Sequence, residues 1–267
     1  MSAEQSLRDG HVSEALEELQ RRIRSNPGHA ADRVFLFQLL AVLGQWERAA
    51  AQLKMAGELD ASALITVQIY RRGIEAELLR ARVFSGATTP LLIGEPPAWM
   101  ALLLQALKLS GEGHYAQAAE LRAQALDGAP ASAGRLNGAA FEWLADADSR
   151  IGPCFELVVD GKYCWVPVVN IRAIHFEAPT DLRDVVWAQG TVTWSNGGQV
   201  PVLMPVRYPG SEASTEPQHQ LAGRTDWEEK PGETFIGIGQ RMLATDAGDY
   251  ALLDVRDIEF DPPAGGT

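Results

Sequence analysis

The chain has 267 residues, of which 46% are hydrophobic and 22% are charged, so it is long enough for two ordinary globular domains and is not expected to be disordered. Its formal net charge of −12 repels nucleic-acid phosphates and anionic lipids, and we therefore expect neither nucleic acid nor a membrane as a partner. The first residues lack the pattern of a secretory signal peptide, and the most apolar stretch, Trp99 to Leu109, is about half the length that spans a bilayer.

Helical spacing dominates the first 150 residues. Apolar residues from Val12 to Ile23 recur on one face of a predicted helix, which Asn26-Pro27-Gly28 ends. A Gly- and Pro-rich loop is predicted over residues 85–97. A last helix is predicted around Phe141, Trp143 and Leu144, with an acidic end near Arg150. The other predicted helices cover residues 32–43, 47–59, 62–84, 98–109 and 115–126.

An internal repeat runs through these helices. Gly10, Gly44 and Gly113 each begin a copy in which a large apolar residue follows two positions on and an alanine three positions after that. The copies are 34 and 69 residues apart, which is one and about two periods of a tetratricopeptide repeat. The glycine permits a tight turn between two helices, and the alanine lets their backbones approach. Residues 61–97 hold no clear copy, so the array is degenerate or interrupted there, and a generic helical bundle is the alternative.

Beyond residue 150 the apolar pattern changes to a period of two, which predicts strands. Asp160-Gly161 and Asn196-Gly197-Gly198 each lie between two such segments and predict β-hairpins. Pro167, Pro201 and Pro205 imply edge positions or irregular pairing. The predicted strands cover residues 155–159, 163–169, 173–177, 185–194, 200–206, 235–243 and 250–258, and residues 209–231 are predicted to form an ordered loop around Trp227.

The chain is therefore predicted to have two parts, a tetratricopeptide-like helical array at residues 1–135 and a mostly antiparallel α+β domain at residues 136–267. The composition changes most sharply near residues 150–153, since residues 1–150 carry a net charge of −3 and residues 151–267 a net charge of −9. The only two cysteines, Cys154 and Cys164, make no disulfide framework, which favours a reducing cytoplasm. They flank a predicted hairpin turn, and whether they approach each other stays open.

The sequence contains no zinc-binding, phosphate-binding or nucleophile-elbow motif, and we expect no cofactor and no enzymatic activity. The most enzyme-like group is Glu142, Asp146 and Asp148, a candidate for a metal-dependent hydrolase. Glu142 and Asp146 are four residues apart, on one face of the predicted helix, and could bind Mg²⁺ or share a proton. A solvated helix end with Arg150 as a partner explains these residues as well. Five tryptophans allow a ligand cage, although core packing is the more ordinary use: Trp143, Trp165, Trp187, Trp194 and Trp227.

Motifs in the second half resemble the ImpE family, also called SciE or TagJ, whose members are accessory proteins of bacterial type VI secretion systems. The resemblance runs through Phe141-Glu142-Trp143, residues 146–153, 161–167, 179–187, 205–211, 225–227 and 237–242. The residues that carry it are either structural or partner-binding, and they are Trp143, Asp146, Asp148, Arg150, Gly152, Pro153, Trp165, Asp184, Trp187, Arg207, Tyr208, Pro209, Gly210, Asp226, Trp227, Gly239, Gln240 and Arg241. The charged members are candidates for ion pairs that fix loops.

The resemblance implies a cytoplasmic, non-catalytic adaptor. Its implied partners are the small subunit of the contractile sheath, bound through that subunit's N-terminal helix, and the AAA+ ATPase that disassembles used sheaths. Tetratricopeptide grooves bind helices or extended peptides, which agrees with this expectation. A generic tetratricopeptide co-chaperone is a further alternative, but it needs a cluster of Lys and Arg to bind a peptide carboxylate, and the front half is slightly acidic.

Overall fold

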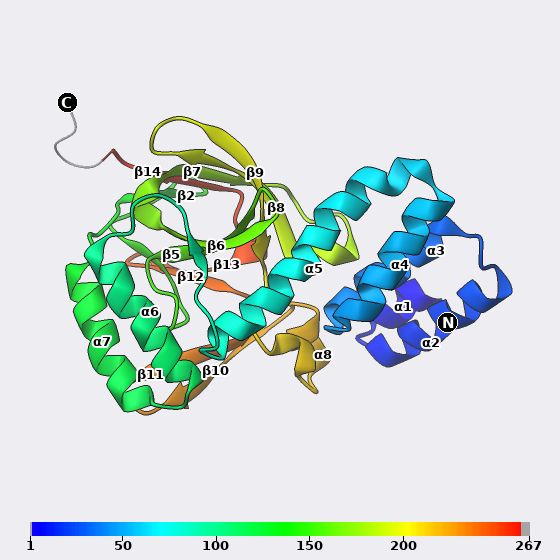
Figure 1. The fold of residues 1–267 in the computed structure, drawn as a ribbon, viewed down its shortest axis with the longest axis horizontal. Helices are drawn as coiled ribbons and strands as arrows, with labels where there is room; N and C mark the ends of the chain where they lie inside the picture. Colours follow the sequence, from blue (N-terminus) through cyan, green and yellow to red (C-terminus); the bar gives the residue numbers. More distant parts are fainter. Residues whose placement is uncertain (1, 263–267) are drawn as a thin grey trace.

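Helices occupy the first half of the chain and strands most of the second in the computed structural model, which describes residues 2–262 (Figure 1). Residues 263–267, the end of the predicted second domain, lie outside the described range. The helices are α1 (Ala3–Arg8), α2 (Val12–Ser25), α3 (Ala30–Val42), α4 (Trp46–Leu59), α5 (Leu64–Phe84), α6 (Ala98–Gly111), α7 (Tyr115–Gly128) and the short α8 (Pro217–Gln220). No helix of the described residues has both the length and the apolar character needed to cross a membrane.

The three repeat copies form helical hairpins, α1 with α2, α3 with α4, and α6 with α7. Their glycines adopt the left-handed conformation that a tight turn needs, with φ of 79° at Gly10, 63° at Gly44 and 85° at Gly113. The repeated alanines are completely buried where the helices meet, namely Ala15, Ala49, Ala56, Ala118 and Ala125. The predicted tetratricopeptide-like hairpins are therefore confirmed.

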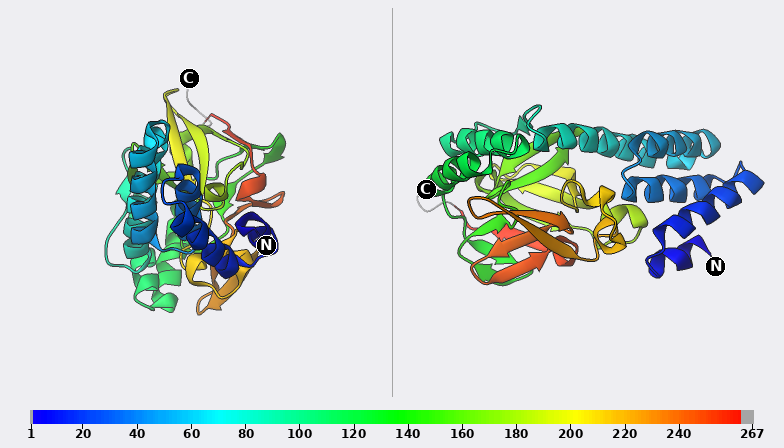
Figure 2. Two further views of the ribbon diagram at one scale, coloured as in Figure 1. Left: turned by 90° about the vertical axis from the view of Figure 1, so that its right-hand side faces the viewer. Right: turned by 90° about the horizontal axis from the view of Figure 1, so that it is seen from below.

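Helix α5 interrupts the repeat array. It has 21 residues and packs along one side of the sheet, where it contacts β5 (Cys154–Val159) and β6 (Lys162–Pro167). Figure 2 shows α5, α6 and α7 along this side, while α1 to α4 project beyond the end of the sheet. The segment without a repeat copy is thus the part of the chain that joins the helical hairpins to the strands.

The main sheet has nine strands in the order β1-β6-β5-β9-β8-β7-β14-β2-β3. All its neighbours pair antiparallel except β1 (Leu91–Leu92), a short strand in the predicted 85–97 loop that pairs parallel with β6. The remaining strands of this sheet are β2 (Gly134–Leu136), β3 (Ala139–Phe141), β7 (Ile171–Phe176), β8 (Trp187–Trp194), β9 (Gln199–Pro205) and β14 (Asp257–Phe260). A mostly antiparallel second half is confirmed.

The predicted helix around residues 141–144 is wrong. This segment contains the end of β3 and the start of β4 (Leu144–Asp146), which pairs with β12 (Met242–Thr245) and through it with β13 (Gly248–Ala251). Three-residue strands are too short to show a period of two, and the partner of β4 lies about a hundred residues away in the chain. Local sequence patterns therefore did not reveal them.

Both predicted hairpins are present. Asp160 and Gly161 have φ of 48° and 74° between β5 and β6, and Gly197 has φ of 86° between β8 and β9. The prolines of β9 lie inside the sheet and not at its edge, because β9 lies between β5 and β8. Pairing between β9 and β5 is limited to Leu203 and Val202, so Pro201 and Pro205 lie outside it. Irregular pairing, and not an edge position, therefore accommodates them.

The predicted loop at residues 209–231 is more regular than expected. It includes α8 and all of β10 (Thr225–Lys230), which pairs with β11 (Thr234–Gly239) in a two-stranded ribbon. Trp227 lies in β10 and is 41% exposed. Most side chains of β10 are polar, so the alternation of apolar and polar residues that predicts a strand is missing there.

The core has two parts, one on each face of the sheet. Tyr163 and Trp165 of β6 join the core of the helices, whereas Cys164 and Val166 of the same strand belong to the core on the opposite face. Cys154 belongs to the helical side, so the two free cysteines lie on opposite faces of the sheet and cannot form a disulfide with each other without rearrangement.

Candidate functional site

Four charged side chains from distant parts of the chain form a buried ionic network under α5. Arg80 of α5 donates to both carboxylate oxygens of Glu156 on β5, at 2.7 and 3.0 Å. Arg241 also donates to Glu156, and its other terminal nitrogen donates to Asp146 of β4. The exposed fraction of each of these residues is 6% or less. The network therefore ties a helix of the first half to three separate strands or loops of the second.

The charges in this network stabilise one another away from water. Burial tends to raise the pKa of Glu156, but the guanidinium groups of Arg80 and Arg241 outweigh it and lower that pKa to about 2. Burial is the main cause that raises the pKa of Asp146 to about 6. The nearby carboxylates of Asp148 and Glu156 also raise it, and the guanidinium of Arg241 lowers it. Glu156 is thus ionised at neutral pH, and each of the two carboxyl groups has a guanidinium partner.

Asp148 and Arg150 form a second ion pair beside the network. Three nitrogens of Arg150, the backbone N–H included, donate to Asp148 at 2.6 to 2.9 Å. The carboxylate of Asp148 also accepts the N–H of Gly237 on β11, and the guanidinium of Arg150 lies 4.8 Å from the centre of the Phe84 ring. The pairing of Asp148 with Arg150 was anticipated, but both belong to a buried turn and not to a solvated helix end.

Glu142 does not join these acids. Its backbone N–H donates to Asp246 at 2.7 Å, and its side chain is exposed in the turn between β3 and β4. The helix face that would have aligned Glu142 with Asp146 does not exist, since both lie in or beside strands. Among residues 2–262, no group of three or more His, Cys, Asp or Glu side chains is arranged to hold a metal ion.

Arg207 links the two halves through backbone carbonyls. Its guanidinium donates to the carbonyl oxygens of Ala41 and Val42 in the last turn of α3, and to that of Gln220 in α8, at 2.6 to 3.2 Å. The end of a helix leaves such carbonyls without partners and carries partial negative charge. Arg207 therefore stabilises the end of α3 and attaches it to the strand domain.

Tyr208 lies between Asp146 and β12. Its hydroxyl donates to Asp146 at 3.0 Å and accepts the N–H of Met242 at 2.9 Å. Gly237 approaches the Tyr208 ring so closely that a Cβ at this position would overlap it. The ring of Trp227 lies 5.6 Å from that of Tyr208 on the outer side.

Several motif residues fix the loops around this site. Gly239 has φ of 96° and leaves no room for a side chain against the carbonyl of Arg224. Gln240 donates to the carbonyl of Ala222 at 2.6 Å and accepts the N–H of Leu253 at 2.9 Å. Gly152 and Gly210 also have positive φ, 61° and 93°, and Pro153 and Pro209 lie beside them in the chain. These residues shape the backbone and present no reactive group.

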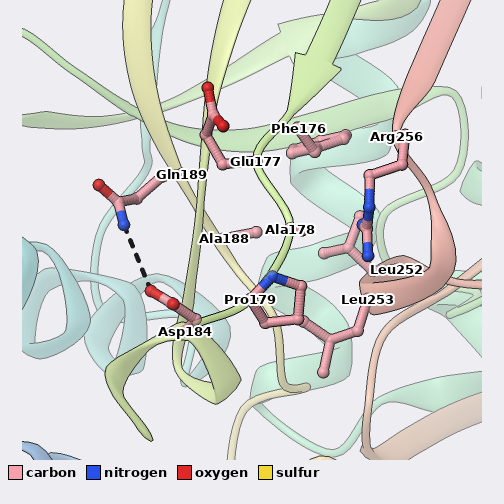
Figure 3. Close-up of a pocket in the computed structure, with 10 residues that line it drawn as sticks. All are labelled: Phe176, Glu177, Ala178, Pro179, Asp184, Ala188, Gln189, Leu252, Leu253 and Arg256. Carbon is pink, nitrogen blue, oxygen red and sulfur yellow. Dashed lines mark hydrogen bonds between the residues drawn. The ribbon is translucent and has the colours of Figure 1, made fainter. Parts of the chain in front are cut away.

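Asp184 caps the short helix η3 (Leu182–Val185). Its carboxylate accepts the N–H groups of Thr180 and Asp181, both at 2.8 Å, and the amide of Gln189 at 3.3 Å. Figure 3 shows Asp184 and Gln189 at one side of a small cavity that Pro179 and Leu253 also line. The cavity measures about 10 Å³, room for about one water molecule, so it is not a ligand site.

Asp226 is bound to His219 and Arg224. Both ring nitrogens of His219 form hydrogen bonds: Nδ1 lies 2.9 Å from Ser214 Oγ, and Nε2 lies 2.9 Å from Asp226 Oδ2. The order resembles a serine-histidine-aspartate triad, but Ser214 Oγ already accepts the N–H of Glu216. The contact of Ser214 is with Nδ1 and that of Asp226 with Nε2, the reverse of the serine-protease arrangement. Residues 214–226 are thus a loop that hydrogen bonds hold together.

The tryptophans do not form a cage. Trp165 and Trp187 are completely buried, with Trp165 donating to Tyr163 and Trp187 donating to Glu77. Trp187 packs with Phe37, Trp46 and Tyr70 of the helices. Trp143 and Trp227 are each 41% exposed on separate elements, and Trp194 is half-buried at the end of β8. Core packing accounts for the two central tryptophans.

The sequence interpretation missed the centre of the network. Glu156, Arg80 and Glu77 were not among the candidate residues, although Glu156 is a single acidic residue inside the otherwise apolar run of residues 154–159. A lone carboxylate in such a strand predicts a buried charge with a cationic partner, because an unpaired one is too costly. That signal was available, but the identity of the partner was not.

Apart from these buried groups, the described residues include one wide groove, about 630 Å³ in volume, between α5 and the sheet. Its floor is the α5-facing side of β8 and β9, with Gln189, Thr191, Pro201 and Leu203 among its residues, and Ile69 and Arg72 belong to its helical wall. The groove contains no cluster of reactive side chains.

Comparison with known proteins gives a family match, a similar relative and a similar solved structure. The family model described as ImpE protein matches residues 138–259. The type VI secretion system accessory component TagJ of Pseudomonas aeruginosa is 48% identical over 262 residues, which cover 98% of this chain and 92% of that relative. The crystal structure of protein VPA1032 from Vibrio parahaemolyticus has the same fold, with a TM-score of 0.88 over 98% of both chains at 23% identity.

Proposed function

We propose that this chain, which belongs to the ImpE family, is a non-catalytic accessory component of a type VI secretion system. The observation that carries the proposal is the 48% identity to TagJ over nearly the whole length of both chains. A similarity of this extent covers the helical hairpins as well as the strand domain. The family resemblance noted in the sequence is thereby confirmed, and the role follows as an inference from the relative's name.

Our proposal for the partner is the small subunit of the contractile sheath, bound through its N-terminal helix in the cytoplasm, with a link to sheath assembly or to recycling by the AAA+ ATPase. The geometry of the motif residues supports a binding role. Apart from Asp226, their charged groups are buried, and all are bonded to other groups of the chain, so little of their chemistry is available to a substrate. In contrast, large apolar side chains remain exposed on α4 and α5, namely Met55, Leu59, Leu64, Ile65, Ile69 and Leu78.

The two alternatives have less support. A metal-dependent hydrolase would need free carboxylates, but Asp146 and Asp148 each have an arginine partner and Glu142 points elsewhere. A co-chaperone that binds C-terminal carboxylates would need a cationic cluster in the helical half, whose net charge over residues 1–150 is −3.

The test is a retention experiment with the full chain. Immobilised protein is incubated with the purified small sheath subunit at micromolar concentration, and in parallel with a subunit that lacks its N-terminal helix. We expect retention of the first and loss of the second. Absence of retention of the intact subunit would contradict the proposed function. A thermal shift series with Mg²⁺ and Mn²⁺ is the accompanying measurement, and we expect a flat response.

A further inference from the structure

The groove beside α5 has a helical wall with exposed side chains, and no other segment of residues 2–262 covers it. Ile65, Gln68, Ile69 and Arg72 follow the spacing i, i+3, i+4 and i+7, so they form a single stripe along the helix. All four are exposed, Ile65 to 73% and Ile69 to 41%. From Ile65 to Arg72 the stripe is about 10 Å long, at 1.5 Å per residue.

The other faces of α5 already have partners. Tyr70, Gly73, Ile74, Glu77 and Arg80 are buried against the sheet. Gly57 of α4 lies against the side chains of Val67 and Leu64, which places α4 on a different side of α5 from Ile69. Gln68, Ile69 and Arg72 of the stripe line the groove, and Ile65 extends the stripe by one turn toward the start of α5.

The shape of the groove favours a helix as its occupant over a strand. Its floor is a sheet face beside a helix, and sheet faces are covered by helices, whereas strands add at edges. The edge of β9 beyond its short pairing with β5 contains Pro201, which has no N–H to donate. A strand could not continue the hydrogen-bonding ladder there. A helix on this floor would form the next member of the layer that α5 belongs to.

The charge around the groove indicates what kind of helix fits. Arg71 and Arg72 lie on its α5 side, although the whole chain has a net charge of −12. Glu75 of the same helix pairs with both arginines, and Gly161, next to Asp160, lies against the Arg72 side chain, while Glu177 follows β7. A second copy of this chain, docked symmetrically, would place the two arginine pairs against each other. A partner with carboxylates along the flank that meets α5 gains attraction instead.

We propose that this groove binds one amphipathic helix of a partner protein, with its apolar side chains against Ile65 and Ile69 and its acidic flank along Arg71 and Arg72. The inference rests on the proposed function, since the helix is taken to be the N-terminal helix of the small sheath subunit. It assigns the binding surface to the junction between α5 and the sheet, and not to the concave side of the α1–α4 hairpins.

The experiment measures binding of a fluorescent peptide with the sequence of that helix to the full chain by anisotropy. Ile69→Asp and Arg72→Glu alter the stripe, and Leu78→Asp is the matched control. Leu78 is 43% exposed on the same helix, nine residues from Ile69 and therefore half a turn away around the axis. All three sites are exposed, and circular dichroism and thermal unfolding verify that each variant is folded.

We expect Ile69→Asp to weaken binding at least about tenfold, as for the central apolar residue of an interface. Arg72→Glu is expected to weaken it severalfold and to reduce its salt dependence. Exchange of one acidic residue of the peptide for lysine is expected to recover part of the affinity for Arg72→Glu. Leu78→Asp is expected to bind within about twofold of the wild type.

The outcomes separate the two proposals. If the wild type binds and both stripe variants bind equally well, the groove assignment is wrong while the proposed function stands. The same conclusion follows if Leu78→Asp weakens binding as much as Ile69→Asp does. A wild-type dimer in sedimentation that Ile69→Asp abolishes would show that a second copy occupies the groove. No binding by the wild type contradicts the proposed function, and the groove assignment is overturned with it.

Discussion

Replacement of Arg80 by methionine removes the helical cation of the ionic network, which also pairs with Glu77 of α5 at 3.4 Å, and keeps most of its apolar stem. The guanidinium donates to Glu156 at 2.7 and 3.0 Å and to the carbonyl oxygen of Arg207 at 2.8 Å. Glu156 then keeps Arg241 as its only cationic partner in the network. We expect this substitution to destabilise the fold and to loosen the attachment of α5 to the sheet.

The magnitude follows from the burial of the groups. Removing one partner of a buried ion pair costs about 3–5 kcal/mol, because the other charge is left without compensation. Arg241 continues to neutralise Glu156, so we expect a loss of about 3 kcal/mol, near the lower end of that range. For a chain of this size the loss corresponds to a decrease of about 6–12 °C in Tm.

The assay is urea unfolding followed by circular dichroism and by tryptophan fluorescence. Arg72→Met is the matched control, since Arg72 lies on the same helix with a half-exposed side chain that pairs only with Glu75. We expect the control to change the free energy of unfolding by less than about 0.5 kcal/mol. A double-mutant cycle with Glu156→Gln is expected to give a coupling energy above about 1 kcal/mol. A loss below about 1 kcal/mol for Arg80→Met, equal to that of the control, would refute the view that the network holds α5 in place.

Three further predictions concern stability and reactivity. The pKa of Glu156 is lowered from 4.5 to about 2, so its contribution of about 3 kcal/mol to stability is complete above pH 4.5 and is lost as the pH falls toward 2. Between pH 5 and pH 3, the free energy of unfolding of Glu156→Gln should therefore decline by about 2 kcal/mol less than that of the wild type. Equal declines would contradict this. Gly10 has a φ of 79° and open space around it, so Gly10→Ala should lower the free energy of unfolding by about 1 kcal/mol. The methyl group of Gly44→Ala would overlap Glu212, so this variant should lose about 2–3 kcal/mol in thermal unfolding. Equal losses would exclude the contact with Glu212 as a cause. Burial raises the pKa of the Cys164 thiol to about 12 and also raises the pKa of the Cys154 thiol. Neither cysteine should therefore react with a thiol reagent in the folded protein, and both should react in urea. Rapid labelling of the native chain would contradict this and show that the strands open.

Local patterns were sufficient for the elements that short-range physics determines. The 3.6-residue spacing of α2 to α7, the positive φ at Gly10, Gly44 and Gly113, and the hairpin turn at Asp160 and Gly161 depend on residues close together in the chain. Such features follow from backbone sterics and from the apolar face of each element. The sequence by itself therefore determined the helical hairpins, the change to strands and the family.

Only the tertiary structure decided what the motif residues do. Arg80 and Glu156 are 76 residues apart in the chain, and Arg241 and Asp146 are 95 apart, so their pairing depends on how α5 and the strands come together. The short strands β2 and β4 likewise exist because distant strands, β14 and β12, offer hydrogen-bond partners. An ion pair or a short strand is a property of two segments, and neither segment specifies its partner. For this reason two of the acidic residues that suggested a metal site, Asp146 and Asp148, are in the folded chain the counter-ions of Arg241 and Arg150.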